Sequence, residues 1–237
     1  MEQIHKSNSR GYFDHGWLRT NHSFSFAGYM NKNRIRFGDL RVLNDDFIDP
    51  GEGFGLHPHS NMEIISLILK GKLAHKDSKG HEHVSSEKGI QVMSAGSGIY
   101  HSEYNASDTE VCNLLQIWIF PDAEGHTPRY DQSEINPEEI KNKPFLFVGP
   151  KESKANLWIN QNAYLSLVEL DGCAIEYKNH DEKNGLFIFV IEGNCQINNH
   201  QLQERDSIEI TENISTKLST TNKVKLLFIE VPLINGV

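Results

Sequence analysis

The stretch GFGLHPHSNMEIISLILKG, from Gly53 to Gly71, joins a polar segment with two histidines to a short apolar run that ends in a glycine. Short runs of the same kind, rich in β-branched and aromatic residues, recur from Phe37 to Pro121. Turn residues separate them at intervals of roughly 8 to 12 residues, the spacing typical of all-β proteins. Several runs are nearly all apolar, as expected for strands buried between two sheets. This part of the sequence therefore predicts an all-β barrel or sandwich.

A polar segment from Asp131 to Pro144 interrupts this pattern. Asn136, followed by Pro137 and two acidic residues, predicts a short helix, because asparagine caps helices and proline suits the first helical position. Beyond the segment, short apolar runs resume with similar lengths and turn spacing. We therefore expect two similar β-domains in tandem. The expected division is residues 1–132, a connecting segment 133–144, and residues 145–237.

The bulk composition fits a globular protein. A length of 237 residues suits two small domains. Hydrophobic residues make up 38% and charged residues 23%, which excludes the disordered and fibrous classes. The N-terminus has no apolar stretch typical of a signal peptide, and no run approaches the ~18 apolar residues that cross a bilayer. We expect no membrane contact and a cytoplasmic location.

The net charge bears on the class of binding partner, and the cysteines bear on the redox compartment. The formal net charge of −9 argues against direct nucleic-acid binding, because phosphates would be repelled across most of the surface. The three cysteines, Cys112, Cys173 and Cys195, lack the spacing of metal or redox motifs. Such a sparse, odd set predicts reduced thiols that pack in the interior, as in a reducing compartment.

Two pairs of polar residues have the spacing of a metal site. In a strand, residues i and i+2 point to the same face, so His57 and His59 aim their rings together. Pro58 between them favours an extended backbone. His101 and Glu103 have the same spacing in GSGIYHSEYN. Two such pairs on facing strands would bring three imidazoles and a carboxylate to one point, which suits a first-row divalent metal and leaves room for water or substrate.

The residues alone do not decide which glutamate completes this set. Glu63 shares the parity of His57 and His59, and Glu103 shares the parity of His101. Strand periodicity is compatible with either carboxylate as the fourth ligand.

The segment from Gly51 to Gly71 resembles the first motif of the cupin superfamily, with His57, His59 and Glu63 at the expected spacing. GIQVMSAGSGIYHSEYN resembles the second motif, although Gly96 stands where a proline is usual. This departure, together with HSE at 101–103, is similar to the pirin branch. RGYFDHGWLRTNHSFSFAGYMN, LAHKDSKG and LLQIWIFPDAEGHTPRYDQ also resemble bacterial pirin-like proteins, so the resemblance covers about residues 10 to 132 and weakens beyond.

The resemblance implies a fold, a ligand set and an activity. The fold would be two tandem cupin barrels, each a jelly roll. The ligands would be His57, His59, His101 and Glu103, with Glu63 in a supporting role. The N-terminal domain would hold one divalent metal, with iron(II) as the first expectation and manganese, cobalt, nickel, copper or zinc as alternatives.

The implied activity is that of a quercetin 2,3-dioxygenase, which cleaves a flavonol with O2 and releases carbon monoxide. Glu103 would be the catalytic base that takes the proton of the flavonol 3-hydroxyl. The alternative is a metal- or redox-dependent regulatory protein that acts through a protein partner. By the same resemblance we expect a monomer.

The other histidines predict no second metal site. In the second half His180 and His200 lack a partner at i+2, and the apolar GLFIFVIEG occupies the place expected for HPHSNME. We therefore expect that half to serve as a scaffold. His75, His81 and His83 lie in a predicted hairpin, where an exposed position is usual, with His75 and Asp77 bracing the turn. His22 is expected to be hydrogen-bonded structure. Candidate pocket residues are Phe24, Phe26, Met93, Ile99 and Trp118.

Overall fold

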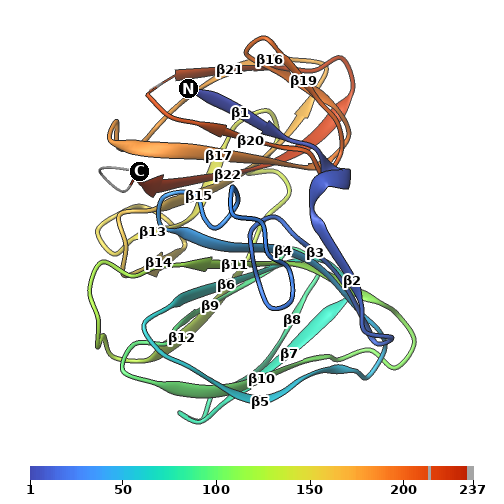
Figure 1. Cartoon of the computed structure of the whole chain (residues 1–237), viewed down its shortest axis with the longest axis vertical. Helices are drawn as coiled ribbons and strands as arrows, with labels where there is room; N and C mark the ends of the chain where they lie inside the picture. Colours follow the sequence, from blue (N-terminus) through green and yellow to red (C-terminus); the bar gives the residue numbers. More distant parts are fainter. Residues whose placement is uncertain (213–214, 234–237) are drawn as a thin grey trace.

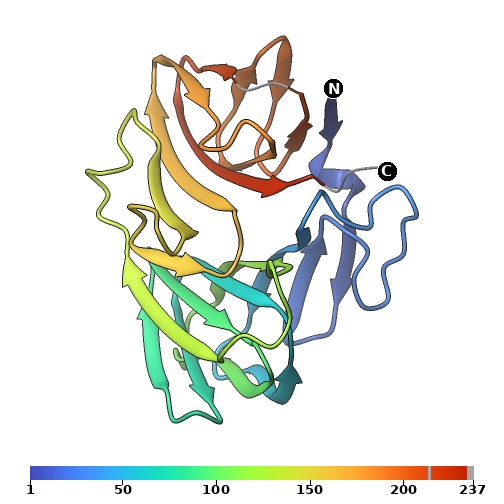
Figure 2. The same ribbon diagram turned by 90° about the vertical axis from the view of Figure 1, so that its left-hand side faces the viewer.

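The structure is a computed structural model that describes residues 1–212 and 215–233. Figures 1 and 2 show two β-sandwiches stacked on each other, with the N-terminal half below and most of the C-terminal half above. A single turn of 3-10 helix, Ser7–Ser9, lies near the N-terminus. Among the residues described, we find no helix with the length and apolar character that a membrane crossing requires. The expected all-β class is confirmed.

The lower sandwich is built from β2 (Gly11–Asp14), β3 (Leu18–His22), β4 (Leu40–Ile48), β5 (Gly53–His59), β6 (Glu63–Lys70), β7 (Lys72–Asp77), β8 (Glu82–Ser86), β9 (Gly89–Ser94), β10 (Ile99–Asn105), β11 (Cys112–Ile119) and β12 (Arg129–Glu134). Seven of these strands form one sheet in the order β12-β9-β6-β11-β4-β3-β2. The other four form a smaller sheet in the order β5-β10-β7-β8.

The upper sandwich is built from β1 (Glu2–His5), β13 (Phe145–Pro150), β14 (Leu157–Ile159), β15 (Tyr164–Asp171), β16 (Ala174–Lys178), β17 (Asn184–Glu192), β18 (Cys195–Ile197), β19 (His200–Leu202), β20 (Ser207–Ile210), β21 (Ser215–Ser219) and β22 (Lys223–Pro232). Its sheets have the orders β1-β20-β17-β22-β15-β13-β14 and β16-β21-β18-β19. The four-stranded sheets of the two halves have the same order of strands, as a repeated architecture requires.

The two seven-stranded sheets pack face to face, and the largest apolar core lies between them. β11 shows how the sequence encodes this arrangement. Leu115 and Ile117 belong to the core shared by both halves, whereas Gln116 and Trp118 face the interior of the lower sandwich. Because both faces of the strand are buried, its sequence is nearly all apolar. Phe187 of the upper sandwich packs into the shared core.

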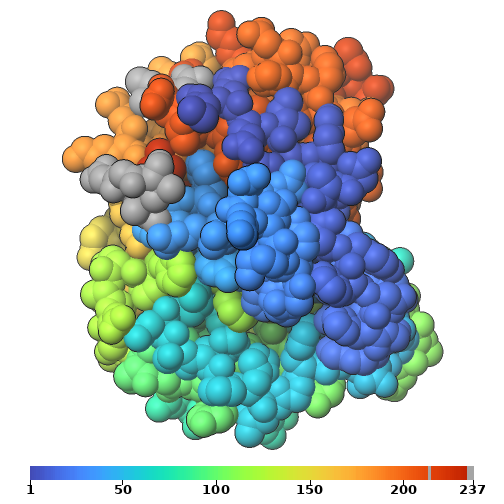
Figure 3. All heavy atoms as spheres, in the orientation of Figure 1, coloured from blue at the N-terminus to red at the C-terminus, as the bar shows by residue number. Residues whose placement is uncertain are grey.

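The first strand departs from the expected division of the chain. β1 pairs antiparallel with β20 of the upper sandwich and makes no pairing with the lower one. Figure 3 shows the N-terminal residues, in blue, running along one face of the molecule from the upper to the lower half. Both ends of the described chain therefore lie with the upper sandwich.

The helix expected after Asn136 is not formed. Asn136 does act as a cap, because its Oδ1 accepts the backbone N–H of Glu138 at 3.1 Å. The chain makes only one turn, however. Asn142 has a φ of 53°, and its N–H donates to the carbonyl of Glu169 in β15. Pairing with the neighbouring sheet therefore replaces a second helical turn.

Candidate metal centre

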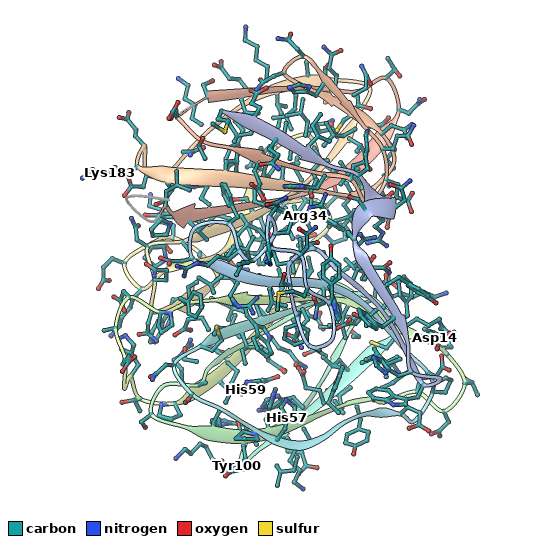
Figure 4. All side chains as sticks on the ribbon, in the orientation of Figure 1. Asp14, Arg34, His57, His59, Tyr100 and Lys183 are labelled. Carbon is teal, nitrogen blue, oxygen red and sulfur yellow. The ribbon has the colours of Figure 1, made fainter. Side chains whose placement is uncertain are left out.

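Three histidines meet inside the lower sandwich, on the paired strands β5 and β10. The register places His101 opposite His57, and Ile99 opposite His59. The ring centroids are 4.5 Å apart for His57 and His101, 4.8 Å for His57 and His59, and 4.9 Å for His59 and His101. One nitrogen of each ring lies within 4.8 Å of the other two. Figure 4 shows His57 and His59 directed inward from β5, and Tyr100 directed outward.

The free nitrogens of these rings fit a metal ion. The Nε2 atoms of His59 and His101 are buried and have no hydrogen-bond partner among the described residues. His57 uses Nδ1 to donate to the carbonyl of Gly55 at 2.7 Å, which leaves its Nε2 as a lone-pair donor. A buried polar atom without a partner costs about 1–3 kcal/mol. A cation between the rings would accept these lone pairs, and imidazole nitrogen suits first-row divalent metals.

The environment keeps the rings in the state that binds metals. Burial, together with the smaller effect of the neighbouring histidines, lowers the pKa of both His59 and His101 to about 3. Both imidazoles are therefore neutral near pH 7, as a ligating histidine must be.

Glu103 lies beside this group but is not one of its members. Its carboxylate accepts hydrogen bonds from Ser66 Oγ at 3.1 Å and from Gln116 Nε2 at 2.8 Å. Together with His75 and His101 it forms a second group whose ligand atoms lie within 4.8 Å of one another. The register between β10 and β5 shifts between His101 and Glu103, because β5 has an extra residue there, and Glu103 therefore lies opposite Phe54. Burial raises the pKa of Glu103.

Glu63 belongs to neither group that could hold a metal. The turn at Asn61, with a φ of 49°, separates His59 from β6, so strand parity does not carry across it. Glu63 and Ile64 point to opposite faces of β6, and Ile64 lines the pocket. The Glu63 carboxylate accepts hydrogen bonds from Ser94 at 2.6 Å and from Asn160 at 2.8 Å. Ser94 lies in the neighbouring strand β9 of the lower sandwich, whereas Asn160 belongs to the upper one.

His75 is buried, against the expectation of an exposed hairpin. β7 lies between β10 and β8, and the register places His75 opposite Glu103 and Asp77 opposite His101. Other residues of the hairpin reach solvent, among them Lys76 and also His83, which lies opposite His75 in β8. Asp77 does brace the turn, since its Oδ1 accepts the backbone N–H groups of Lys79 and His81. The sequence could not show that β7 pairs with β10.

His22 is buried, and burial lowers its pKa to about 4. Its ring stacks on Phe13 at 5.3 Å and meets the edge of Phe26 at 5.3 Å. Its Nδ1 has no hydrogen-bond partner among the described residues. Aromatic packing therefore holds His22, together with a hydrogen bond to the backbone of Phe26.

A cavity of about 200 Å³ opens beside the three histidines. Of the candidate pocket residues, Phe26 and Trp118 line it. Phe24 instead packs on Phe187 between the halves, with ring centroids 5.7 Å apart. The remaining two candidates, Met93 and Ile99, form a separate small apolar cluster with other residues.

The sequence interpretation missed the polar wall of this cavity. Asn44 and Asp46 line it from β4, and burial raises the pKa of Asp46 to about 7. Gln116 contributes from β11. One signal could have revealed this wall: polar residues stand at alternate positions within otherwise apolar strands. A purely apolar core has no need of buried polar side chains, so such residues indicate a polar site.

The upper sandwich has apolar side chains where the lower one has histidines. By strand order, β16 and β21 correspond to β5 and β10, whereas GLFIFVIEG is β17, which corresponds to β6. The stretch compared with HPHSNME was therefore the wrong counterpart. Ile175, Tyr177 and Leu218 contribute to an apolar core that fills the sandwich. Within residues 1–212 and 215–233, the groups that could hold a metal all lie in the lower half.

Comparisons with known proteins agree with this architecture. The family model described as Pirin matches residues 3–119, and the model described as Quercetinase C-terminal cupin domain matches residues 146–231. A relative from Escherichia coli (strain K12), named quercetin 2,3-dioxygenase, is 36% identical over 232 residues, or 98% of this chain and 99% of the relative.

Solved structures from Escherichia coli show the same fold at 35% identity. The crystal structure of YhhW has a TM-score of 0.93 and covers 100% of both chains. A crystal structure of bacterial pirin YhhW in complex with nickel(II) has a TM-score of 0.92 and covers 99% of this chain and 100% of that one. The cupin motifs, the two stacked sandwiches and the full-length matches lead to one assignment: this chain belongs to the pirin family and is a quercetinase-like bicupin.

Proposed function

We propose that this protein is a metal-dependent dioxygenase that cleaves a flavonol such as quercetin with O2 and releases carbon monoxide. The observation that carries the proposal is the group of three histidines at the wall of a cavity that also contains a buried carboxylate, with buried nitrogens of His59 and His101 that have no partner among the described residues. The names of the full-length relatives supply the substrate class. The three cysteines form no disulfide, which is consistent with our proposal that the protein is located in the reducing environment of the cytoplasm.

The proposed ligands are His57, His59 and His101, with Glu103 as the fourth. Their nitrogen and oxygen donors suit one divalent transition metal, and iron(II) is our first choice. The nickel(II) complex of the relative YhhW supports the choice of a divalent ion. Such an ion would draw electron density from a phenolic oxygen bound to it and so ease the ionisation of that oxygen.

The protein's own groups would do the remaining work. Glu103, held by Ser66 and Gln116, would accept the proton of the flavonol 3-hydroxyl. Burial raises the pKa of this carboxyl, which brings a general base closer to the working pH. Trp118 and Phe26 meet edge to face, with centroids 5.3 Å apart, and offer apolar walls to a flat aromatic substrate. They also limit the entry of water.

A metal-by-metal assay tests the proposal. The metal-free protein is loaded anaerobically with iron, manganese, cobalt, nickel or copper and then mixed with quercetin and O2. We expect quercetin and O2 to be consumed and carbon monoxide to be released with at least one metal. Glu103→Gln should lose this activity. If no metal supports turnover while binding persists, the proposal fails and a binding protein that acts through a protein partner takes its place.

A further inference from the structure

A line of hydrogen-bonding groups leads from His101 away from the cavity. His101 Nδ1 lies 3.5 Å from His75 Nδ1, at the long end of the hydrogen-bond range. His75 Nε2 lies 3.2 Å from Asp77 Oδ2, and His81 Nδ1 lies 2.9 Å from the same oxygen. His101, His75 and Asp77 are 1%, 2% and 7% exposed, so water does not compete for these contacts.

Strand pairing and stacking fix the members of this line. The register of β10 against β7 places His101 opposite Asp77 and His75 opposite Glu103. The ring of Tyr130 stacks on His75 at 4.1 Å with an interplanar angle of 18°. The backbone N–H groups of Lys79 and His81 hold the other oxygen of Asp77. Each group therefore has little freedom to turn away.

The chemistry of the line allows one arrangement of protons. An ionised Asp77 accepts hydrogen bonds, so the facing Nε2 of a neutral His75 carries the proton. His75 Nδ1 then has a lone pair and accepts a hydrogen bond from His101 Nδ1–H. His101, with its proton on Nδ1, keeps the lone pair on Nε2, which is the buried nitrogen without a partner.

We propose that Asp77 and His75 are positioning residues that fix the tautomer and ring orientation of His101, so that its Nε2 lone pair faces the metal. This inference rests on the proposed metal site. Metal-binding histidines usually donate their second N–H to a carboxylate or carbonyl. Here a second imidazole stands between the ligand and the carboxylate.

A second metal among His75, His101 and Glu103 is the competing interpretation of the same side chains. The Nδ1 atoms of His101 and His75 lie 3.5 Å apart, at a hydrogen-bonding separation, and an ion bound to both would require a lone pair from each. A shared proton satisfies this contact, whereas a second ion would break it.

Tautomers are measured directly in the metal-free protein by long-range ¹H–¹⁵N correlation NMR at a pH where the rings are neutral. We expect the proton of His101 on Nδ1 and that of His75 on Nε2. A His101 that carries its proton on Nε2 would overturn the proposal. This measurement needs neither metal nor activity.

Variants then test the effect on metal binding, with nickel(II) alone as the probe. His75→Phe keeps a ring against Tyr130 but removes the acceptor, and we expect the Kd to rise about 10- to 100-fold. His75→Asn keeps an acceptor near the position of Nδ1 and should restore much of the affinity. His83→Phe is the matched control, because His83 also stacks on Tyr130 but lies outside the line.

Asp77→Asn gives a sharper result. One oxygen must still accept the N–H groups of Lys79 and His81, so the new amide NH2 would face His75. This would move the proton of His75 to Nδ1 and that of His101 to Nε2, where it blocks the metal. We expect a loss of affinity at least as large as in His75→Phe.

The outcomes separate this inference from the proposed function. Unchanged affinity in both His75→Phe and Asp77→Asn, with His57→Ala unable to bind, would reject the positioning role and leave the metal site in place. Unchanged affinity in His57→Ala would reject the site itself. Two bound nickel ions per chain, one of them lost in His75→Phe, would establish the competing interpretation.

Discussion

The carboxylate of Glu63 accepts a 2.8 Å hydrogen bond from the side-chain amide of Asn160, a residue 97 positions further along the chain in the other sandwich. Glu63 has the spacing of a metal ligand in the sequence, yet this bond directs it to the contact between the two halves. Glu63 is only 1% exposed, so loss of its carboxylate would leave the buried side chains that donate to it without an acceptor. The residue thus stabilises the stacking of the sandwiches.

Replacement of Glu63 should affect stability but not metal binding. We expect Glu63→Ala to lower the free energy of unfolding by about 1–3 kcal/mol, because Asn160 and Ser94 would lose their partner. Urea unfolding measures this loss, and nickel(II) titration should give the wild-type stoichiometry. Glu63→Gln keeps an acceptor for Asn160 and is the control. Loss of metal from folded Glu63→Ala would return Glu63 to the ligand set.

The three-histidine group should hold one metal per chain. We expect His59→Ala to lose bound metal, because two imidazoles and a carboxylate leave the ion open to water. Elemental analysis of the purified protein gives the stoichiometry. His200→Ala is the control, since His200 lies in the upper sandwich and pairs with Glu2 at the surface. Metal retained after His57→Ala combined with His101→Ala would contradict the assignment.

Gln116 should lower the pKa of Glu103, the proposed catalytic base. Its Nε2 donates to Glu103 at 2.8 Å and so stabilises the charged carboxylate. Gln116→Leu removes this donor, and the pKa of Glu103 should rise further. We expect the acidic limb of the pH profile of kcat/KM to move to higher pH. An unmoved limb with reduced kcat would mean that Glu103 is not the titrating group.

Stability of the metal-free protein should fall with acid. The folded pKa of His59 and His101 is about 3, compared with 6.5 for free histidine. Between these values the unfolded chain binds protons that the folded chain does not. The contribution is therefore complete above pH 6.5 and is lost as pH falls toward 3, at up to about 1.4 kcal/mol per pH unit for the fully buried His101. Urea unfolding at several pH values measures the slope, and His101→Asn should reduce it.

The apolar core between the sandwiches should make them unfold together. Phe187 is fully buried there against Phe24 and Phe37, at centroid distances of 5.7 and 6.0 Å. Phe187→Ala should cost about 3–5 kcal/mol. We expect calorimetry to show one transition at a lower Tm. Two separated transitions in the wild-type protein would contradict a shared core.

Local periodicity was enough to predict that the first pair of histidines converges. His57 and His59 converge because alternate residues of one strand share a face, and Pro58 keeps that strand extended. Glu103 shares a face of β10 with His101 by the same alternation, but the residues alone could not choose between Glu103 and Glu63 as the carboxylate. Glu63 shares the correct parity, but a turn at Asn61 cancels it.

Contacts between distant strands explain most of what the sequence could not predict. His75 lies beside His101 because β7 pairs with β10, and no local pattern specifies that pairing. The helix expected at Asn136 yields to a backbone hydrogen bond from Asn142 to Glu169. In both cases tertiary pairing decides a feature that local propensity leaves open.

The pairing of β1 with β20 also concerns the order in which the chain is made. His5 and Glu209, which form a 2.9 Å hydrogen bond across these strands, are 204 residues apart. At typical rates of synthesis the first strand must wait roughly 10 to 40 seconds for its partner. Its polar sequence, EQIH, limits pairing with other chains during that interval. β1 is thus synthesised well before its partner strand, and its pairing is completed only when the later strands of the upper sandwich have been made.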